Sequence, residues 1–103
     1  MGKNKDIEIL TNLMSKSLRH KIGSIVNENE IYSMKYAKDA DVLMKEAEKI
    51  LNKWNWSNTD KIMIKNKLIK KLKKELEDKD FIDNMKFEIM DKEIEKALKN
   101  FNL

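Results

Sequence analysis

The single histidine of the chain, His20, is the first residue to consider for chemistry, because an imidazole can act as an acid or a base near neutral pH. General acid–base catalysis also needs a positioned carboxylate and a nucleophile beside that imidazole. The residues near His20 at helical spacing are Lys16, Ser17, Ser24 and Glu28, and they do not form such a set. We therefore expect His20 to be structural, and the protein not to be an enzyme.

Metal and redox chemistry have little support from the residue types. The sequence has no cysteine, which excludes disulfides, thiolate zinc sites and cysteine nucleophiles, and it has no second histidine. The acidic run Glu75, Glu77, Asp78 and Asp80 lacks the spacing and the glycine of an EF-hand calcium loop. The sequence therefore predicts no cofactor and no metal site.

Lysines are the first candidate residues for binding nucleic acid. The segment 61–74 is rich in lysine and contains no acidic residue. Four of its lysines recur at helical spacing and would form one positive stripe: Lys67, Lys70, Lys71 and Lys74. Such a stripe suits non-specific contact with phosphates, whereas base readout favours arginine, which occurs only at Arg19. The alternative is a plain solvated face, because lysine is common throughout the chain.

Two tryptophans close together, Trp54 and Trp56, are the candidate residues for binding a protein partner. Exposed tryptophans are frequent hot spots of protein–protein interfaces. The alternative interpretation is that both rings pack at a corner between two helices. The sequence leaves both interpretations open.

The elements that must position these residues are helices. Hydrophobic residues make up 41% of the chain and charged residues 39%, proline is absent, and glycine occurs only at Gly2 and Gly23. Folds rich in β-strands need turns built from Gly, Pro or Asn-Gly pairs. A chain of 103 residues normally forms one domain. We therefore expect residues 1–103 to form a single all-α domain, a compact bundle of about four helices.

Apolar residues at steps of three and four mark four helical segments: 7–25, 36–54, 64–76 and 85–101. Gly23 stands where the first helix could end or bend, because glycine accepts left-handed backbone angles. Ser57 and Asp60 predict a capping box at the start of the third helix, with Asp in place of the preferred Glu or Gln. Trp56, just before that cap, is placed to pack back on the helix.

Membrane insertion and export have no support in the sequence. The first residues read MGKNKDIEIL, which lacks the continuous apolar stretch of a signal peptide. No apolar run approaches the ~20 residues that a spanning helix needs. We therefore expect a cytoplasmic protein without membrane contact. Its net charge of +4 gives weak support to an acidic or nucleic-acid partner.

Two stretches of the chain match a pattern of a known family. The run Leu18-Arg19-His20-Lys21-Ile22 is followed by Asn27-Glu28-Asn29 and by an aromatic residue, Tyr32. Further on, Trp56-Ser57 precedes a basic amphipathic helix that contains Lys67, Leu68, Lys70, Lys71 and Leu72. Over residues 18–76 the chain resembles the C-terminal helical region of the motor (R) subunits of type I restriction enzymes.

The resemblance implies a docking role, because this region of the motor subunits is implicated in holding the motor on the methyltransferase core. The chain departs from the family pattern at Glu30, where proline is frequent, and at Ser33, where a second aromatic residue is frequent. The segment 81–103 matches no part of the pattern. The chain also lacks the nuclease and helicase domains, so the resemblance implies a detached fragment or a stand-alone relative.

Two functions are compatible with these observations. The first is a non-catalytic helical assembly module that holds a protein partner, which is a methyltransferase complex if the resemblance holds. The alternative is a small basic helical protein that binds nucleic acid through the lysine stripe. Salt separates the two, because affinity for DNA should fall steeply with salt only in the second case.

Overall fold

The computed structural model describes residues 2–26, 30–78, 84–101 and 103, with the side chains of 25–26, 30–32, 77–78 and 84–87 left out. Within this part the chain forms four α-helices and no strand. They are α1 (Gly2–Val26), α2 (Glu30–Leu51), α3 (Asn58–Asp78) and α4 (Asn84–Asn100). The prediction of an all-α bundle of about four helices is therefore confirmed. None of these helices is long and apolar enough to cross a bilayer.

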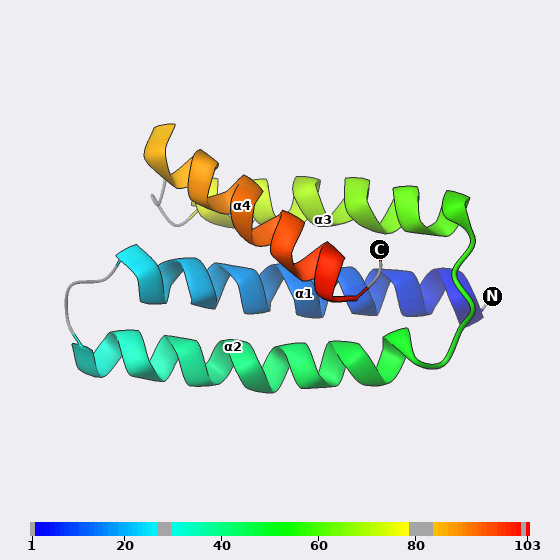
Figure 1. Cartoon of the computed structure of the whole chain (residues 1–103), viewed down its shortest axis with the longest axis horizontal. Helices are drawn as coiled ribbons and strands as arrows, with labels where there is room; N and C mark the ends of the chain where they lie inside the picture. Colours follow the sequence, from blue (N-terminus) through cyan, green and yellow to red (C-terminus); the bar gives the residue numbers. More distant parts are fainter. Residues whose placement is uncertain (1, 27–29, 79–83, 102) are drawn as a thin grey trace.

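Helix α1 is the centre of the bundle. It lies between α2 and α3, and α4 crosses diagonally over α1 and α3 (Figure 1). Helix α2 packs against α1 alone, since its described backbone comes close to neither α3 nor α4. The bundle is therefore closed on the side of α3 and open between α2 and α4.

The core is built mainly from α1, α3 and α4. Its side chains repeat every three or four residues along these helices, as the sequence pattern predicts. They are Ile7, Leu10, Met14, Leu18, Ile22, Ile64, Leu68, Leu72, Leu76, Met90, Ile94, Ala97 and Leu98. The predicted core positions Ile25, Met85 and Phe87 lie outside the described side chains. Each fully buried leucine or isoleucine contributes roughly 1.5–3 kcal/mol to stability.

Polar side chains are also buried in α1, because neighbours surround this helix on three sides. The hydroxyl of Thr11 donates to the carbonyl oxygen of Ile7 at 2.8 Å, and that of Ser15 donates to Asn12 at 3.0 Å. Ser17 instead reaches the next helix, where its hydroxyl donates to the carbonyl oxygen of Ala40 at 2.7 Å. The last bond fixes the register between α1 and α2, since it joins a buried donor to one particular carbonyl.

Helix α2 buries less of its apolar stripe than the sequence pattern suggests. Among the described side chains of α2, only Ala40 and Ala47 are fully buried, against α1, while Met44 is half-buried and Ala37 is exposed. The helix ends at Leu51, so the prediction that its stripe extends to Trp54 is wrong. The chain turns there because the amide of Lys53 donates to the carbonyl of Ile50, three residues back, at 3.1 Å.

The predicted capping box at the start of α3 is confirmed. The amide of Asp60 donates to the hydroxyl oxygen of Ser57 at 3.1 Å, and the amide of Ser57 donates to the Asp60 carboxylate at 3.1 Å. Lys3 from α1 forms an ion pair with the same carboxylate at 2.6 Å. The Lys3 ammonium, and then the Ser57 amide, hold the pKa of Asp60 below its usual value.

Gly23 does not end α1, which continues to Val26, so the prediction that the helix could end at this residue is wrong. The ring of Tyr36 on α2 lies over it, and a Cβ atom at Gly23 would stand 3.4 Å from Tyr36 Cδ2. That distance is a close but ordinary van der Waals contact. The glycine therefore occupies an interior helical position that an alanine can fill.

Replacing Gly23 by alanine is expected to raise the free energy of unfolding by about 0.5–1 kcal/mol. Alanine is the better helix former by roughly this amount, and its methyl group would touch the Tyr36 ring. Urea unfolding followed by circular dichroism measures the change. Gly2→Ala is the matched control and should have little effect, because Gly2 stands at the first position of the helix. A loss of stability in Gly23→Ala would contradict the contact with Tyr36.

Candidate functional site

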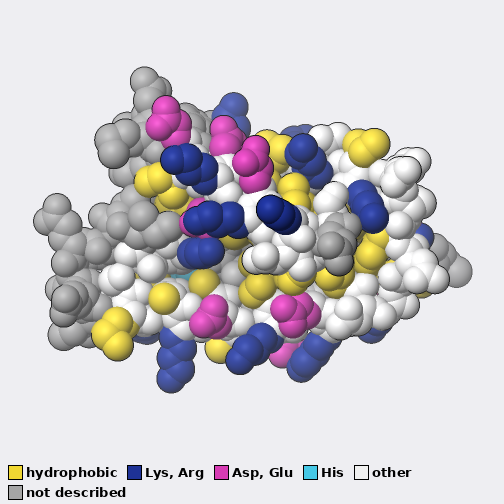
Figure 2. Space-filling model, viewed as in Figure 1, with side chains coloured by type: hydrophobic (Ala, Val, Ile, Leu, Met, Phe, Trp, Pro, Cys, Tyr) yellow, Lys and Arg dark blue, Asp and Glu magenta, His cyan; other side chains and the backbone are white. Residues whose placement is uncertain are grey.

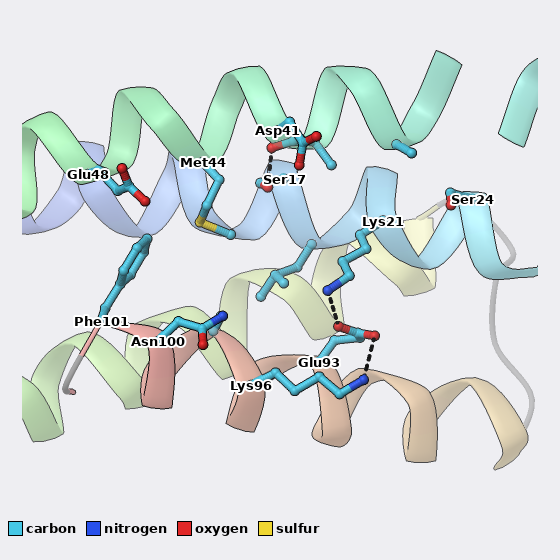
Figure 3. Close-up of a pocket in the computed structure, with 14 residues that line it drawn as sticks. Ser17, Lys21, Ser24, Asp41, Met44, Glu48, Glu93, Lys96, Asn100 and Phe101 are labelled. Carbon is cyan, nitrogen blue, oxygen red and sulfur yellow. Dashed lines mark hydrogen bonds and ion pairs between the residues drawn. The ribbon is translucent and has the colours of Figure 1, made fainter. Parts of the chain in front are cut away.

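The open side of the bundle holds a groove of about 590 Å³ between α2 and α4 (Figure 3). Its floor is α1, with Ser17, Leu18, Lys21 and Ser24. One wall is α2, with Ala37, Ala40, Asp41, Met44 and Glu48. The other wall is the second half of α4 and the residue after it, with Glu93, Lys96, Ala97, Asn100 and Phe101. The groove exists because α2 and α4 both pack on α1 without meeting each other.

A buried carboxylate, Glu93, lies in the wall formed by α4. Only 5% of its side chain is exposed, and Lys21 from α1 approaches it at 2.8 Å. Lys96, one turn further along α4, stands 3.7 Å from the other carboxylate oxygen. Both lysines point toward Glu93 (Figure 3). A buried charge requires partners of opposite sign, so the pair with Lys21 fixes α4 on α1 at this point, and the pair with Lys96 lies within α4.

The wall formed by α2 carries two carboxylates of a different kind. Asp41 and Glu48 are exposed, and within the described part of the chain neither forms an ion pair. They stand on either side of Met44, whose thioether lies in the groove (Figure 3). In the space-filling view, the charged side chains next to the hydrophobic band are carboxylates on the α2 side and lysines on the α4 side, while both signs occur further out over each helix (Figure 2). The two walls therefore differ in charge.

The predicted lysine stripe of α3 is divided between two environments. Lys67 and Lys71 point toward α1 and bind the carboxylate of Glu8 at 2.9 and 2.8 Å. Lys71 also donates to the hydroxyl oxygen of Thr11 at 2.8 Å. Lys70 and Lys74 are exposed, and Lys74 borders a depression beside Asn12 and Lys16 of α1. Helical spacing places all four lysines on one broad face, but it does not reveal the carboxylate that α1 brings to two of them.

The pKa of Glu8 falls from 4.5 to about 2, because Lys71 and then Lys67 donate hydrogen bonds to its ionised form. An acid with a lower pKa in the folded state stabilises the fold above its unfolded pKa, and this contribution is lost as the pH falls toward 2. Glu8→Gln is therefore expected to make the loss of stability between pH 5 and pH 2 shallower. Urea unfolding across this range measures the slope. An unchanged slope would show that these bonds do not form in solution.

Trp54 and Trp56 lie together at the corner between α2 and α3, and both rings are half-buried. The indole of Trp54 donates to the Asp6 carboxylate at 2.7 Å, and that of Trp56 donates to the carbonyl oxygen of Leu51 at 2.9 Å. The ammonium of Lys3 stands 5.9 and 5.6 Å from the two rings. These contacts favour the interpretation as corner packing, because the polar atom of each ring already has a partner.

His20 lies outside the groove, half-buried beside Tyr36, with the ring centroids 5.7 Å apart. Burial first, and the neighbouring charge of Arg19 second, lower the pKa of His20. Arg19 Nη2 stands 3.4 Å from His20 Nε2, in position to donate to a neutral ring. Among the described side chains no three of the metal-binding types, His, Cys, Asp and Glu, come together. Packing and the charge of Arg19 therefore disfavour the protonated form of His20.

The fold and this groove define a small all-α protein with an open side. Comparisons with protein-family models, with curated proteins and with solved structures found no match. The resemblance of residues 18–76 to the motor subunits therefore stays a prediction.

Proposed function

We propose that this chain is a non-catalytic helical assembly module that binds a protein partner in the groove between α2 and α4. The observation that carries the proposal is the position of α2, which packs on α1 alone and leaves the groove open along its length. Binding of a helix in such a groove is a recurring mode of protein recognition.

The side chains of the groove suit a helical occupant. Ala37 and Ala40 on one wall and Ala97 on the other are small, so the backbone of a further helix can approach closely. Met44 and Phe101 add larger apolar surface, and methionine adapts its shape to a partner. A helix bound in the groove would lie beside α4, and both helices would then pack over α1.

The distribution of ionisable groups favours binding over catalysis. The buried carboxylate in the groove, Glu93, already has Lys21 and Lys96 as partners. His20, the one imidazole, lies outside the groove. Asp41 and Glu48 do face the groove, but they lie two helical turns apart, and among the described side chains none hydrogen-bonds to either of them to complete a catalytic set. His20→Ala is accordingly not expected to affect partner binding.

The resemblance of residues 18–76 suggests which partner this module holds. The C-terminal helical region of type I restriction motor subunits is implicated in docking the motor on the methyltransferase core. We propose the same class of partner for this chain, a methyltransferase complex. Neighbouring genes for a methyltransferase and a specificity subunit would support this choice of partner.

A second candidate function, binding of nucleic acid, rests on the exposed position of Lys70 and Lys74. Lys67 and Lys71 contribute less to it, because Glu8 neutralises them in part. Under this candidate, affinity for duplex DNA falls steeply with salt, by about 0.9 in the logarithmic slope per phosphate contact. Lys70→Glu/Lys74→Glu would then weaken binding and flatten that slope. Under the assembly proposal, DNA binding is weak with and without the change.

Position-specific photo-crosslinking tests the proposal. A photoreactive benzoylphenylalanine replaces Ala37 in the groove or, as the matched control, Val42, which is exposed on α2 and does not line the groove. The chain is expressed in the cells that make it naturally. We expect one discrete adduct with another protein from position 37 and none from position 42. The purified partner should then bind Ala37→Trp at least about tenfold more weakly than the unchanged chain, because the indole fills the groove. Adducts from position 42 alone, or from neither, would overturn the proposal.

A further inference from the structure

The groove between α2 and α4 has walls of unequal charge, and this asymmetry identifies the chemistry of its occupant. Resting on the proposed function, we infer that the occupant is an amphipathic helix with basic side chains along the flank that faces α2. Its apolar face packs on Met44, Ala97 and Phe101, and its other flank, toward α4, carries no basic side chain. The inference follows from which charges in the groove already have partners.

The acidic wall has uncompensated charge. Asp41 and Glu48 are both exposed, both line the groove, and within the described residues neither has an ion-pair partner. They lie two helical turns apart along α2, about 10 Å at a rise of 1.5 Å per residue. Glu46, by contrast, lies outside the groove and is paired with Lys49 at 3.1 Å. The two carboxylates that line the groove on this wall are therefore both available to an occupant.

The opposite wall is neutralised and slightly positive. Lys21 and Lys96 share a single carboxylate, that of Glu93, so the three groups together carry one net positive charge. A cation placed against this wall would meet two ammonium groups. A cation placed against α2 would meet Asp41 or Glu48. Complementary charge at the rim of an interface selects the partner and fixes its orientation more than it adds affinity.

The length of the groove sets the length of the occupant. The lining residues of α2 extend from Ala37 to Glu48, about 16 Å, which corresponds to three turns of helix. At its far end the groove continues past Phe101 into a shallower depression beside Leu51 and Asn52. A volume of about 590 Å³ accommodates the side chains of one helical face. A helix of about four turns with basic residues two turns apart would reach both carboxylates.

Three synthetic peptides that share one apolar face test the inference on the full chain. Each is an amphipathic helix of about four turns with Leu and Ala on one face, and at two flank positions two turns apart it carries Arg, Gln or Glu. Fluorescence anisotropy of the labelled peptide measures the dissociation constant. We expect the Arg peptide to bind about tenfold more tightly than the Glu peptide, with the Gln peptide between them.

Charge-reversed variants test whether Asp41 and Glu48 cause the preference for the Arg peptide. In Asp41→Lys/Glu48→Lys the order of the three peptides should reverse. Glu46→Lys/Glu95→Lys has the same change in net charge outside the groove and should keep the original order. Circular dichroism checks the fold of both variants. If the first variant fails to fold, the order of the peptides on the unchanged chain still decides the question.

The possible results separate this inference from the proposed function. Equal binding of all three peptides, lost in Ala37→Trp, would overturn the charge preference and leave the groove as a docking site. Tighter binding of the Glu peptide, or binding of none, would also overturn the inference. The cross-linking experiment is independent of these outcomes, because it uses the natural partner.

Discussion

Leu18→Ala is expected to lower the free energy of unfolding by about 3 kcal/mol. Leu18 is 1% exposed and belongs both to the core and to the floor of the groove. Removing a buried leucine side chain forfeits its transfer free energy and leaves a cavity, which together amount to roughly 2–5 kcal/mol. Urea unfolding of the two proteins measures the difference.

Ile9→Ala is the matched control on the same helix. Ile9 is 39% exposed, so its loss should change the free energy of unfolding by less than about 1 kcal/mol. Equal effects of the two substitutions would contradict the central position of α1. Enlargement of the floor in Leu18→Ala should also weaken the binding of any partner that packs on α1.

The second large effect is expected for Lys21→Met, which should lower the free energy of unfolding by roughly 2–3 kcal/mol. The change keeps the length of the side chain and leaves the buried Glu93 with Lys96 alone, at 3.7 Å. Removal of one partner of a buried ion pair is costly because the other charge stays buried. The expected value lies below the roughly 3–5 kcal/mol usual for a fully buried pair, since Lys21 is half-exposed.

Glu93→Gln in the background of Lys21→Met should recover part of this loss, because it removes the unpaired charge. Lys49→Met is the control, since it removes a lysine from the exposed pair with Glu46 and should change stability by less than about 0.5 kcal/mol. If Lys21→Met and Lys49→Met behave alike, the ion pair with Glu93 does not anchor α4.

The fold could be predicted from the sequence because local signals and burial agree in most of the chain. Ile64, Leu68, Leu72 and Leu76 recur at helical spacing, and all four are fully buried. The capping box of Ser57 and Asp60 is a contact within one turn of chain, which spacing alone specifies.

The groove could not be predicted from the sequence, because it exists only where α2 and α4 do not contact each other. The apolar stripe of α2 predicts a core-facing surface, but the stripe does not say that only α1 will cover it. By periodicity Asp41 and Glu48 belong to the solvated face of α2. The sequence also does not distinguish the buried Glu93 from the exposed glutamates of α4. Their roles arise from the packing of three helices on one another.

Contacts between segments that are distant in the sequence account for the other differences between the predictions and the structure. Glu8 is fifty-nine residues from Lys67 in the sequence, so no local pattern links the two side chains. Lys71 consequently looks like a solvated residue in the sequence, although it bonds to Glu8 and Thr11. The neighbour of Gly23 could not be predicted for the same reason, since the ring that lies over it comes from Tyr36 on α2.

The most direct test of the central claim is to map where the cross-linked partner binds on the full chain. Amide chemical shifts of the labelled chain are followed as the purified partner is added. The groove as docking site predicts that the largest changes occur at Ala37, Met44, Ala97 and Phe101, with little change at Lys70 and Lys74. Changes concentrated at Lys70 and Lys74, or at Trp54 and Trp56, with the groove unaffected, would contradict it.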